Sequence, residues 1–189
     1  MRVDVPLAKA YLLLNHGPVT LISSRDGDRT NVMAASWAMP LDFDPPKVVV
    51  VIDRNTLTRE LVDASREFAI NIPPRALADT TLSVGSVTGR DADKWTRFGV
   101  APMAASRIEA PLVEGCIGWL ECRLLPERDV EQKYDLFVAE VVAASADDRV
   151  FSNGRWHFDD EALRTVHYVA GGQFFTIGAA LMGRAPGDG

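Results

Sequence analysis

The most constraining feature of this 189-residue chain is an unbroken apolar run, KVVVVI, from Lys47 to Ile52. Two prolines precede the run and Asp53 follows it, so it is bounded by residues that end strands and is short for a helix. A continuous apolar run of this length is typical of a strand that is buried on both faces. We therefore predict such a strand here, at the centre of an organising stretch from Asn31 to Thr58.

The residues after this strand suggest an anion site at the start of a helix. The apolar spacing Leu57, Leu61, Ala64, Phe68 describes one helical face. The N-terminus of such a helix offers unpaired N–H groups and the positive end of its dipole, and an arginine adds a two-pronged donor. Two interpretations remain open, a phosphate site and a buried helix cap. The candidate residues are Arg54, Asn55, Thr56 and Thr58.

Composition narrows the class of protein. Apolar residues make up 47% and charged residues 24%, which is ordinary for one globular domain, and we expect a core over about residues 15–175 with a loose tail over 183–189. The formal charge of −6, without clustered Lys or Arg, argues against nucleic-acid binding. No segment resembles a signal peptide or a membrane span, so a cytoplasmic protein is expected. Cys116 and Cys122 are expected on one face of a strand as reduced core thiols.

The order of the remaining elements predicts a mainly β fold. Strands separated by turn residues outnumber helices and do not alternate with them regularly, which favours an antiparallel, Greek-key-like β-barrel with peripheral helices. The stretch from Asn31 is expected to supply two strands joined by a loop over 41–46. Other strands are expected at 19–23, 68–72, 117–125 and 134–143, helices at 6–14, 75–86 and 94–98, and polar turns at 24–29 and 126–133.

Absent motifs exclude several chemistries. The chain contains neither Gly-x-Gly-x-x-Gly nor Gly-x-Ser-x-Gly, and its three histidines, His16, His157 and His167, lack metal-ligand spacing. A hydrogen-bonded structural role is favoured for each of them, and no metal site and no catalytic side chain are predicted. A reaction that needs none of these groups is one whose chemistry belongs to a bound cofactor.

The chain resembles the flavin reductase-like family, which has an FMN-binding split-barrel fold, and within it the flavoredoxin-type branch. Each matching segment is weak alone, but together they follow the family's order over most of the chain. They are Pro18-Val19-x-Leu21-Ile22-Ser23, Asn31-x-Met33-x-x-Ser36-Trp37-x-x-Pro40, Asp44-Pro45-Pro46, Arg54-x-x-x-Thr58-x-Glu60-Leu61, Glu67-Phe68-x-x-Asn71-x-Pro73, Gly89-Arg90-Asp91-x-Asp93-Lys94, Glu121-Cys122, Leu136-Phe137-Val138-x-Glu140-Val141 and His167-Tyr168-x-x-Gly171-Gly172.

The resemblance implies a homodimer with FMN near the subunit interface. The flavin ring would lie along the segment that contains Asn31, Met33, Ala34, Ala35, Ser36 and Trp37, and its phosphate on Arg54, Asn55, Thr56 and Thr58. The loop that carries Arg90 and Lys94 would approach the cofactor or the partner subunit, and Tyr168 would edge the pocket.

Several roles stay open at this point. The Ala-Ala-Ser segment is equally well an interior strand, and for Trp37 we favour core over flavin contact. Lys94 suits a phosphate contact or a surface ion pair, and Tyr168 suits pocket or dimer core. The ribose phosphate of NADPH, as opposed to NADH, would need a cation, for which Arg25, Arg29, Arg90 and Lys94 are candidates.

The expected activity is transfer of a hydride from NADH or NADPH to FMN, with electrons passed on to an unidentified acceptor or oxygenase. The alternatives are a non-catalytic FMN-binding electron carrier and a flavin-free dimeric barrel that binds another ligand.

Overall fold

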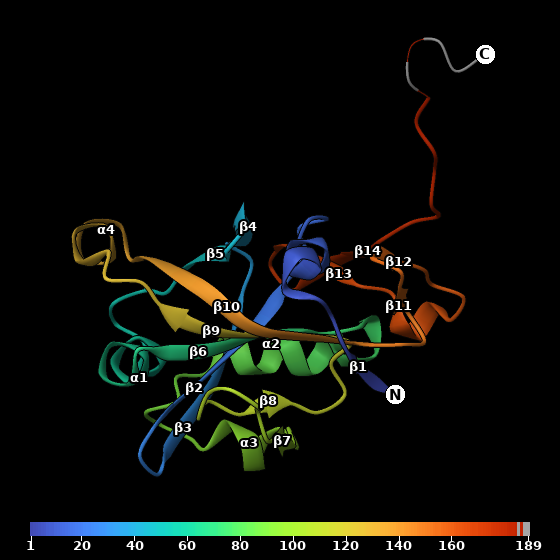
Figure 1. Cartoon of the computed structure of the whole chain (residues 1–189). Coiled ribbons are helices and arrows are strands. Elements are labelled where there is room, and N and C mark those ends of the chain that lie inside the picture. The colour runs from blue at the N-terminus through green and yellow to red at the C-terminus, as the bar shows by residue number, and fades with distance from the viewer. Residues whose placement is uncertain (185, 187–189) are drawn as a thin grey trace.

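The computed structural model describes residues 1–184 and 186. Its centre is one antiparallel sheet in the order β3-β2-β6-β9-β10-β5-β4, with β1 paired to the end of the long strand β10 (Figure 1). The strands of this sheet are β1 (Arg2–Asp4), β2 (Thr20–Asp26), β3 (Arg29–Ala35), β4 (Ala38–Phe43), β5 (Pro46–Val51), β6 (Glu67–Ile72), β9 (Gly118–Leu124) and β10 (Leu136–Asp147). The predicted mainly β fold with an antiparallel sheet is confirmed.

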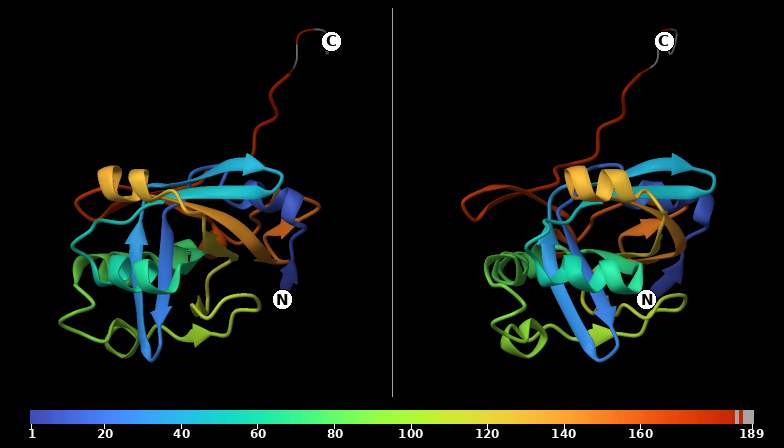
Figure 2. Two further views of the ribbon diagram at one scale, coloured as in Figure 1. Left: turned by 60° about the vertical axis from the view of Figure 1, so that its left-hand side comes forward. Right: turned by 90° about the vertical axis from the view of Figure 1, so that its left-hand side faces the viewer.

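Helices and small hairpins surround the sheet (Figure 2). The helix α1 packs on β2 and β3, α2 packs on β3, and η1 lies against β10, β4 and β5. The helices are η1 (Leu7–Leu13), α1 (Leu57–Ser65), η2 (Arg75–Leu77), α2 (Ala78–Ser86), α3 (Lys94–Arg97), α4 (Arg128–Tyr134) and η3 (Glu161–Leu163). The small two-stranded sheets pair β7 (Pro102–Met103) with β8 (Leu112–Val113), β11 (Phe151–Ser152) with β12 (Arg155–Trp156), and β13 (Val166–Ala170) with β14 (Gln173–Thr176).

Three local predictions were wrong. The segment 126–133 contains α4 instead of a plain turn, and β2 continues to Asp26, so the β2–β3 turn is only Gly27 and Asp28. The stretch from Asn31 supplies parts of three strands, because the chain bends after Ala35 and begins a second hairpin, β4–β5. A loose tail was expected over 183–189. Of this stretch the structure describes residues 183, 184 and 186, and the others lie outside the described residues.

The apolar run forms β5 as predicted, but only one of its faces is buried. Val48 and Val50 are 1% and 0% exposed, whereas Lys47, Val49 and Val51 on the other face are half-buried. The face of β5 with Lys47, Val49 and Val51 is less covered because η1 and the main core occupy only the other side of the sheet at this edge.

Two apolar clusters lie on the two sides of the central strands. The larger contains Cys122 with Phe68 and Phe137, and the smaller contains Cys116 with Trp95 and Trp119. Both thiols are free and buried as expected, but Cys116 precedes β9 and does not share the face of Cys122.

Glu121, in β9, is a charged residue that is only 4% exposed. Its carboxylate accepts hydrogen bonds from the backbone N–H groups of Ser106 and Arg107, at 2.9 and 2.6 Å, and from the Ser106 hydroxyl. These donors come from the segment that crosses this face of β9, and they compensate for the burial of the charge.

Asn71 shows the same compensation in β6. Its Nδ2 donates to Leu21 O at 3.0 Å and to the Ser23 hydroxyl at 2.9 Å, and its Oδ1 accepts from the backbone N–H of Val113. This residue therefore joins β6 to β2 and β8 inside the core.

Each histidine has a hydrogen-bond partner. His16 Nε2 lies 2.9 Å from the Thr165 hydroxyl, His157 bonds to Ser152, and His167 bonds to Gly17 O. Burial, with a smaller effect of His167, lowers the pKa of His16 from its ordinary value to about 4.

This pKa predicts a pH dependence of stability. Between pH 6.5 and 4 the unfolded chain binds a proton at His16 that the folded chain does not, so the free energy of unfolding falls by up to about 3 kcal/mol as the pH is lowered. Urea unfolding at pH 7, 5.5 and 4.5 measures the slope. A His16→Gln variant should lose most of it and a His157→Gln variant should keep it; equal slopes in all three proteins would contradict the assignment.

Candidate functional site

A cleft of about 590 Å³ opens where the end of β3, the end of β5, the end of α4 and the β13–β14 hairpin meet. This volume lies within the range of small-molecule sites, roughly 300–1,000 Å³. The lining residues are Met33, Ala34, Ala35, Ser36, Trp37, Val51, Asp53, Tyr134, Asp135, Tyr168 and Val169. The structure thus brings together six of the predicted site residues, from Met33 to Trp37 and Tyr168.

β3 lines the cleft with the small side chains of Ala34 and Ala35, so a ligand can come close to its backbone. Among the described residues, β3 is the last strand of the sheet and pairs only with β2, so one edge of its backbone faces away from the sheet. On its other side it lies against α2, where a Cβ at Gly85 would sit 3.1 Å from the Cβ of Ala34. A flat ligand can therefore approach the backbone of β3 along Ala34, Ala35 and Ser36.

Trp37 lies at the rim of this cleft and is 74% exposed, so its expected place in the core was wrong. The chain bends between β3 and β4, and the neighbours Ala35 and Ala38 take the buried positions. The indole is thereby turned away from the core.

Asn31 lies beneath the cleft instead of lining it. It is 3% exposed, and its Nδ2 donates to the Thr58 hydroxyl at 2.8 Å. A Cβ at Gly89 would sit 2.3 Å from Asn31 Oδ1, so the loop from Gly89 can cover this amide only without a side chain. Asn31 and Thr58 therefore join β3 to α1, and Thr58, which is fully buried, presents no free hydroxyl to a ligand.

Thr56 acts as the N-cap of α1. Its hydroxyl accepts from the N–H of Arg59 at 3.1 Å, as the alternative capping interpretation anticipated. The N–H groups of Leu57 and Thr58, in the first turn, have no partner within the helix. Exposed Asn55 and Arg54 precede them, so the helix start combines a cap with two exposed donor side chains, whereas Leu57 and Thr58 themselves are buried.

The Arg54 guanidinium lies beside Asp135 of the cleft wall. It donates to Asp135 Oδ2 at 3.3 Å and to Gln132 O at 3.0 Å, and its side chain is 58% exposed. Arg59 holds Asp135 from behind, with Nη1 3.0 Å from Asp135 Oδ1. The predicted phosphate arginine therefore contacts the cleft wall without lining the cleft, and it shares its charge with a carboxylate that sequence reasoning missed.

The loop from Gly89 to Lys94 differs from its expected role. Lys94 is 4% exposed and its Nζ donates to Val32 O and Val84 O at 3.0 and 2.7 Å, so a surface ion pair is wrong. Burial lowers the pKa of Lys94 to about 8. Arg90 pairs with Glu60 at 2.8 Å, and bonds from Arg29 and then Arg90 hold the pKa of Glu60 below its usual range.

None of the four cations considered for a ribose phosphate lines the cleft. Arg29 and Arg90 share Glu60, Lys94 points inward, and Arg25 donates to Gly27 O. The charged groups that do line it are Asp53 and Asp135.

The cleft residues that sequence reasoning missed are Val51, Asp53, Tyr134, Asp135 and Val169. Asp53 and Val51 were visible as the end of the apolar strand. Tyr134 ends α4 and Asp135 follows it, and this segment was predicted as a turn, so no pattern placed them beside β5. The link is the hydrogen bond from Ile52 N–H to Asp135 O at 2.9 Å, a contact across the sheet.

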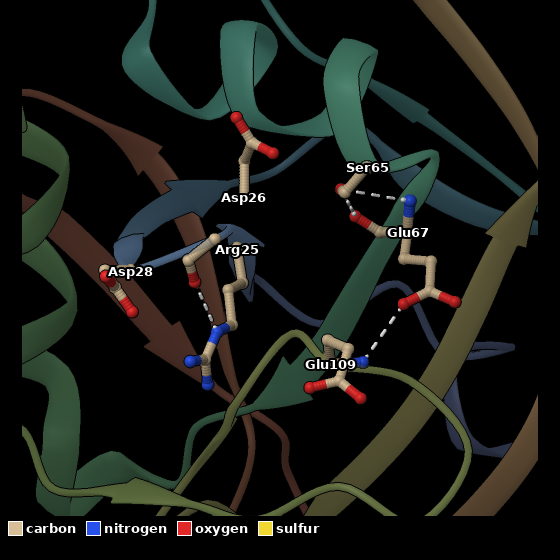
Figure 3. Close-up of a pocket in the computed structure, with 7 residues that line it drawn as sticks. Arg25, Asp26, Asp28, Ser65, Glu67 and Glu109 are labelled. Atoms are coloured by element: carbon tan, nitrogen blue, oxygen red, sulfur yellow. Dashed lines mark hydrogen bonds between the residues drawn. The ribbon is translucent and has the colours of Figure 1, made fainter.

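Other hollows lie beside or outside the cleft. One of about 610 Å³ is lined by Arg29, Arg90 and Leu57 at the start of α1, together with Asp28, Asp91 and Asp93. A hollow of about 460 Å³, shown in Figure 3, shares no residue with the cleft. Its lining has four carboxylates, Asp26, Asp28, Glu67 and Glu109, against one cation, Arg25. A smaller cavity of about 110 Å³ adjoins the cleft through Ala34, Ser36 and Tyr168 and extends it toward α2.

The sequence of this chain matches a known family. Residues 13–167 match the family described as flavin reductase like domain, so the chain is a member of that family. Its fold is the FMN-binding split barrel, as in the structural relatives below.

Two relatives cover nearly the whole chain. A solved FMN-binding domain of a flavin reductases-like enzyme from Shewanella baltica OS155 is 45% identical, with a TM-score of 0.95 and coverage of 97% of this chain and 98% of that one. The uncharacterized protein YddH of Escherichia coli (strain K12) is 46% identical over 93% of this chain and 95% of its own length. The flavoredoxin of Desulfovibrio vulgaris (Miyazaki F), at 24% identity and a TM-score of 0.77 over 88% of this chain and 90% of that one, shares the fold. In the part of the chain that the structure describes, no helix is long and apolar enough to cross a membrane.

Proposed function

We propose that this protein is an FMN-binding oxidoreductase that accepts a hydride from NADH or NADPH and passes electrons onward. The observation that carries the proposal is the cleft over Ala34, Ala35 and Ser36, which reaches Asp53, three residues before the Thr56 cap of α1. A flat ring fits the small side chains of β3, and a phosphate fits the donors of Arg54, Asn55 and the first turn of α1. The similarity to an FMN-binding domain supports the same cofactor.

The residues of the chain would bind and orient the cofactor. The outer edge of β3 offers backbone groups to a ring edge, Arg54 offers charge, and Trp37 and Tyr168 shield the mouth from water. FMN, when bound, supplies the hydride-accepting and electron-transferring chemistry. We also propose a homodimer, because Trp37 and its neighbours on β4 expose large apolar side chains.

The second candidate is an FMN electron carrier that a partner protein reduces. Its support is the charge of the cleft lining, since Asp53 and Asp135 do not favour a dinucleotide with its several negative charges.

An anaerobic titration tests both candidates. The purified protein is loaded with FMN, and its visible absorption is followed after NADH and then NADPH. Bleaching of the flavin band supports the oxidoreductase, and the faster donor identifies the nucleotide. Tight FMN without bleaching leaves the carrier, and the absence of any FMN binding overturns both.

Arg54→Ala tests the phosphate site. The variant loses a charge-assisted hydrogen bond, which should weaken FMN binding by about 1.5–3 kcal/mol, or roughly 10- to 100-fold in Kd. Arg75→Ala is the control, because Arg75 is a similarly exposed arginine, paired with Glu161 away from the cleft. Isothermal titration of both variants decides; an unchanged Kd for Arg54→Ala removes this residue from the site.

A further inference from the structure

The edge strand β4 exposes large apolar side chains, which are unusual on a strand that faces solvent. Met39, Leu41 and Phe43 are 55%, 51% and 63% exposed along this strand, and Trp37 precedes them at 74%. A bulge at Leu41 breaks the alternation, so Met39 shares the face of Val49 while Phe43 lies on the side of η1, where its ring centre is 4.8 Å from that of Tyr11. We call these four residues the β4 strip. β4 pairs only with β5 in the described sheet, so its second backbone edge is also without a strand. A long, apolar, exposed edge is a surface on which another chain binds.

A second apolar segment lies at the other end of the chain. The Ile177 N–H donates to Thr165 O at 3.0 Å and Ile177 O accepts from Arg164, so the chain is fixed to the body up to this residue. The residues from 178 to 184, which we call the C-terminal arm, then leave the body (Figures 1 and 2). Leu181 and Met182 in this arm are 89% and 79% exposed.

The arm and the β4 strip lie on the same side of the molecule. Figure 2 shows the arm rising beyond the β4–β5 hairpin and not bending back onto it. A second copy that faced this side would therefore bring its own strip within reach of the arm. In a two-fold dimer the contact would occur twice, because each patch of an isologous interface meets its symmetry equivalent.

The chemistry of the two segments is complementary. The arm offers two flexible apolar side chains to the four apolar side chains of the strip. Arg184 carries a positive charge at the end of the arm, and exposed Asp44 lies in the β4–β5 turn, whereas Asp42 in β4 is paired with Lys47 at 2.6 Å. A second copy packed on the strip would also cover Val49 and Val51, which lie beside the strip on the half-buried outer face of β5.

We propose that the C-terminal arm of each chain packs on the β4 strip of a second copy. The inference rests on the homodimer of the proposed function and adds the element that holds it together. Because the arm follows β14 directly, and the β13–β14 hairpin lines the cleft through Tyr168 and Val169, this exchange also connects dimer formation to the cleft wall.

Sedimentation equilibrium of the full chain and of three variants tests the exchange. One variant ends at Gly178, which keeps the hydrogen bonds of Ile177, and the others are Leu181→Asp/Met182→Asp and Leu41→Asp/Phe43→Asp. Each should raise the dimer dissociation constant by about 100-fold or more, since several apolar side chains lose their burial. Ala101→Asp/Ala104→Asp, at exposed positions beside β7, is the control and should dimerise like the natural sequence.

The outcomes separate the arm from the dimer. If the natural sequence is a dimer and the arm variants dimerise equally well, the arm exchange is overturned and the dimer stands. If the natural sequence is a monomer, both are overturned. FMN titration of the same samples tests the cofactor proposal independently.

Cross-linking determines which chain the arm contacts. Burial raises the pKa of both native thiols, so engineered cysteines are the accessible ones. Met39→Cys and Met182→Cys proteins of different tagged size are mixed and treated with a bis-maleimide. A cross-linked heterodimer supports the exchange. A cross-link confined within one chain, in a dilute Met39→Cys/Met182→Cys double variant, would show that the arm folds onto its own strip and would overturn it.

Discussion

Replacing Arg59 by alanine is expected to lower the free energy of unfolding by about 3–5 kcal/mol, the range for breaking a buried ion pair. The Arg59 side chain is 10% exposed and bonds to Asp63 at 2.7 Å, to Asp135 at 3.0 Å and to Glu131 O at 3.1 Å. Its guanidinium also lies 4.5 Å from the centre of the Phe137 ring. The variant leaves Asp135 without its rear partner, and so it should also weaken FMN binding at the cleft.

Urea unfolding at pH 7 measures the effect, with Arg29→Ala as the matched control. Arg29 is 53% exposed and pairs with Glu60 at the surface, so its removal should cost at most about 1 kcal/mol. The loss in free energy of unfolding for Arg59→Lys should fall between those of Arg59→Ala and Arg29→Ala, because an ammonium cannot satisfy the same set of acceptors as a guanidinium. Equal losses for Arg59→Ala and Arg29→Ala would show that the buried network contributes no more than a surface pair.

Ser36→Phe should weaken FMN binding by at least about 100-fold. Ser36 is exposed and lines both the cleft and the small cavity beside it, so a phenyl ring there occupies the space above the β3 wall. The loss should exceed that of Arg54→Ala, since steric exclusion removes the ring contacts and not one hydrogen bond. The fold should be retained within about 0.5 kcal/mol, as for other surface changes.

Calorimetric titration with FMN checks this expectation, and circular dichroism checks the fold. Ser152→Phe is the control, because Ser152 is an exposed serine in the β11–β12 hairpin that lines neither hollow of the site. Unchanged FMN affinity in Ser36→Phe, with the fold intact, would place the cofactor elsewhere on the molecule.

Local patterns predicted most elements and part of the cleft. The apolar face from Leu57 predicted α1 with a cap at Asn55 or Thr56, of which Thr56 is the one observed, and Ala34 and Ala35 were placed on a strand. These signals are short in range, because periodicity and caps act within a few residues. The family resemblance supplied the split-barrel fold and the expected cofactor.

Contacts between distant segments could not be predicted in this way. The partners of Lys94 are backbone carbonyls of Val32 and Val84, which carry no sequence signature. Similarly, Glu121 alternates like a surface residue and is buried only because residues 106 and 107 cross its strand face. The α4 helix was missed because its seven residues are mostly polar and offer little apolar periodicity.

The position of Trp37 provides the chain with a built-in optical probe. Trp95 and Trp119 are buried in the smaller cluster and Trp156 packs on the larger one, whereas Trp37 is the exposed indole and stands at the mouth of the cleft. The long-wavelength edge of the intrinsic emission therefore belongs to Trp37, and the short-wavelength edge to the other three. Quenching of the long-wavelength edge alone would report a ligand that enters the cleft. A blue shift of the same edge on concentrating the protein would report that a second chain covers Trp37. Loss of the short-wavelength edge would report unfolding.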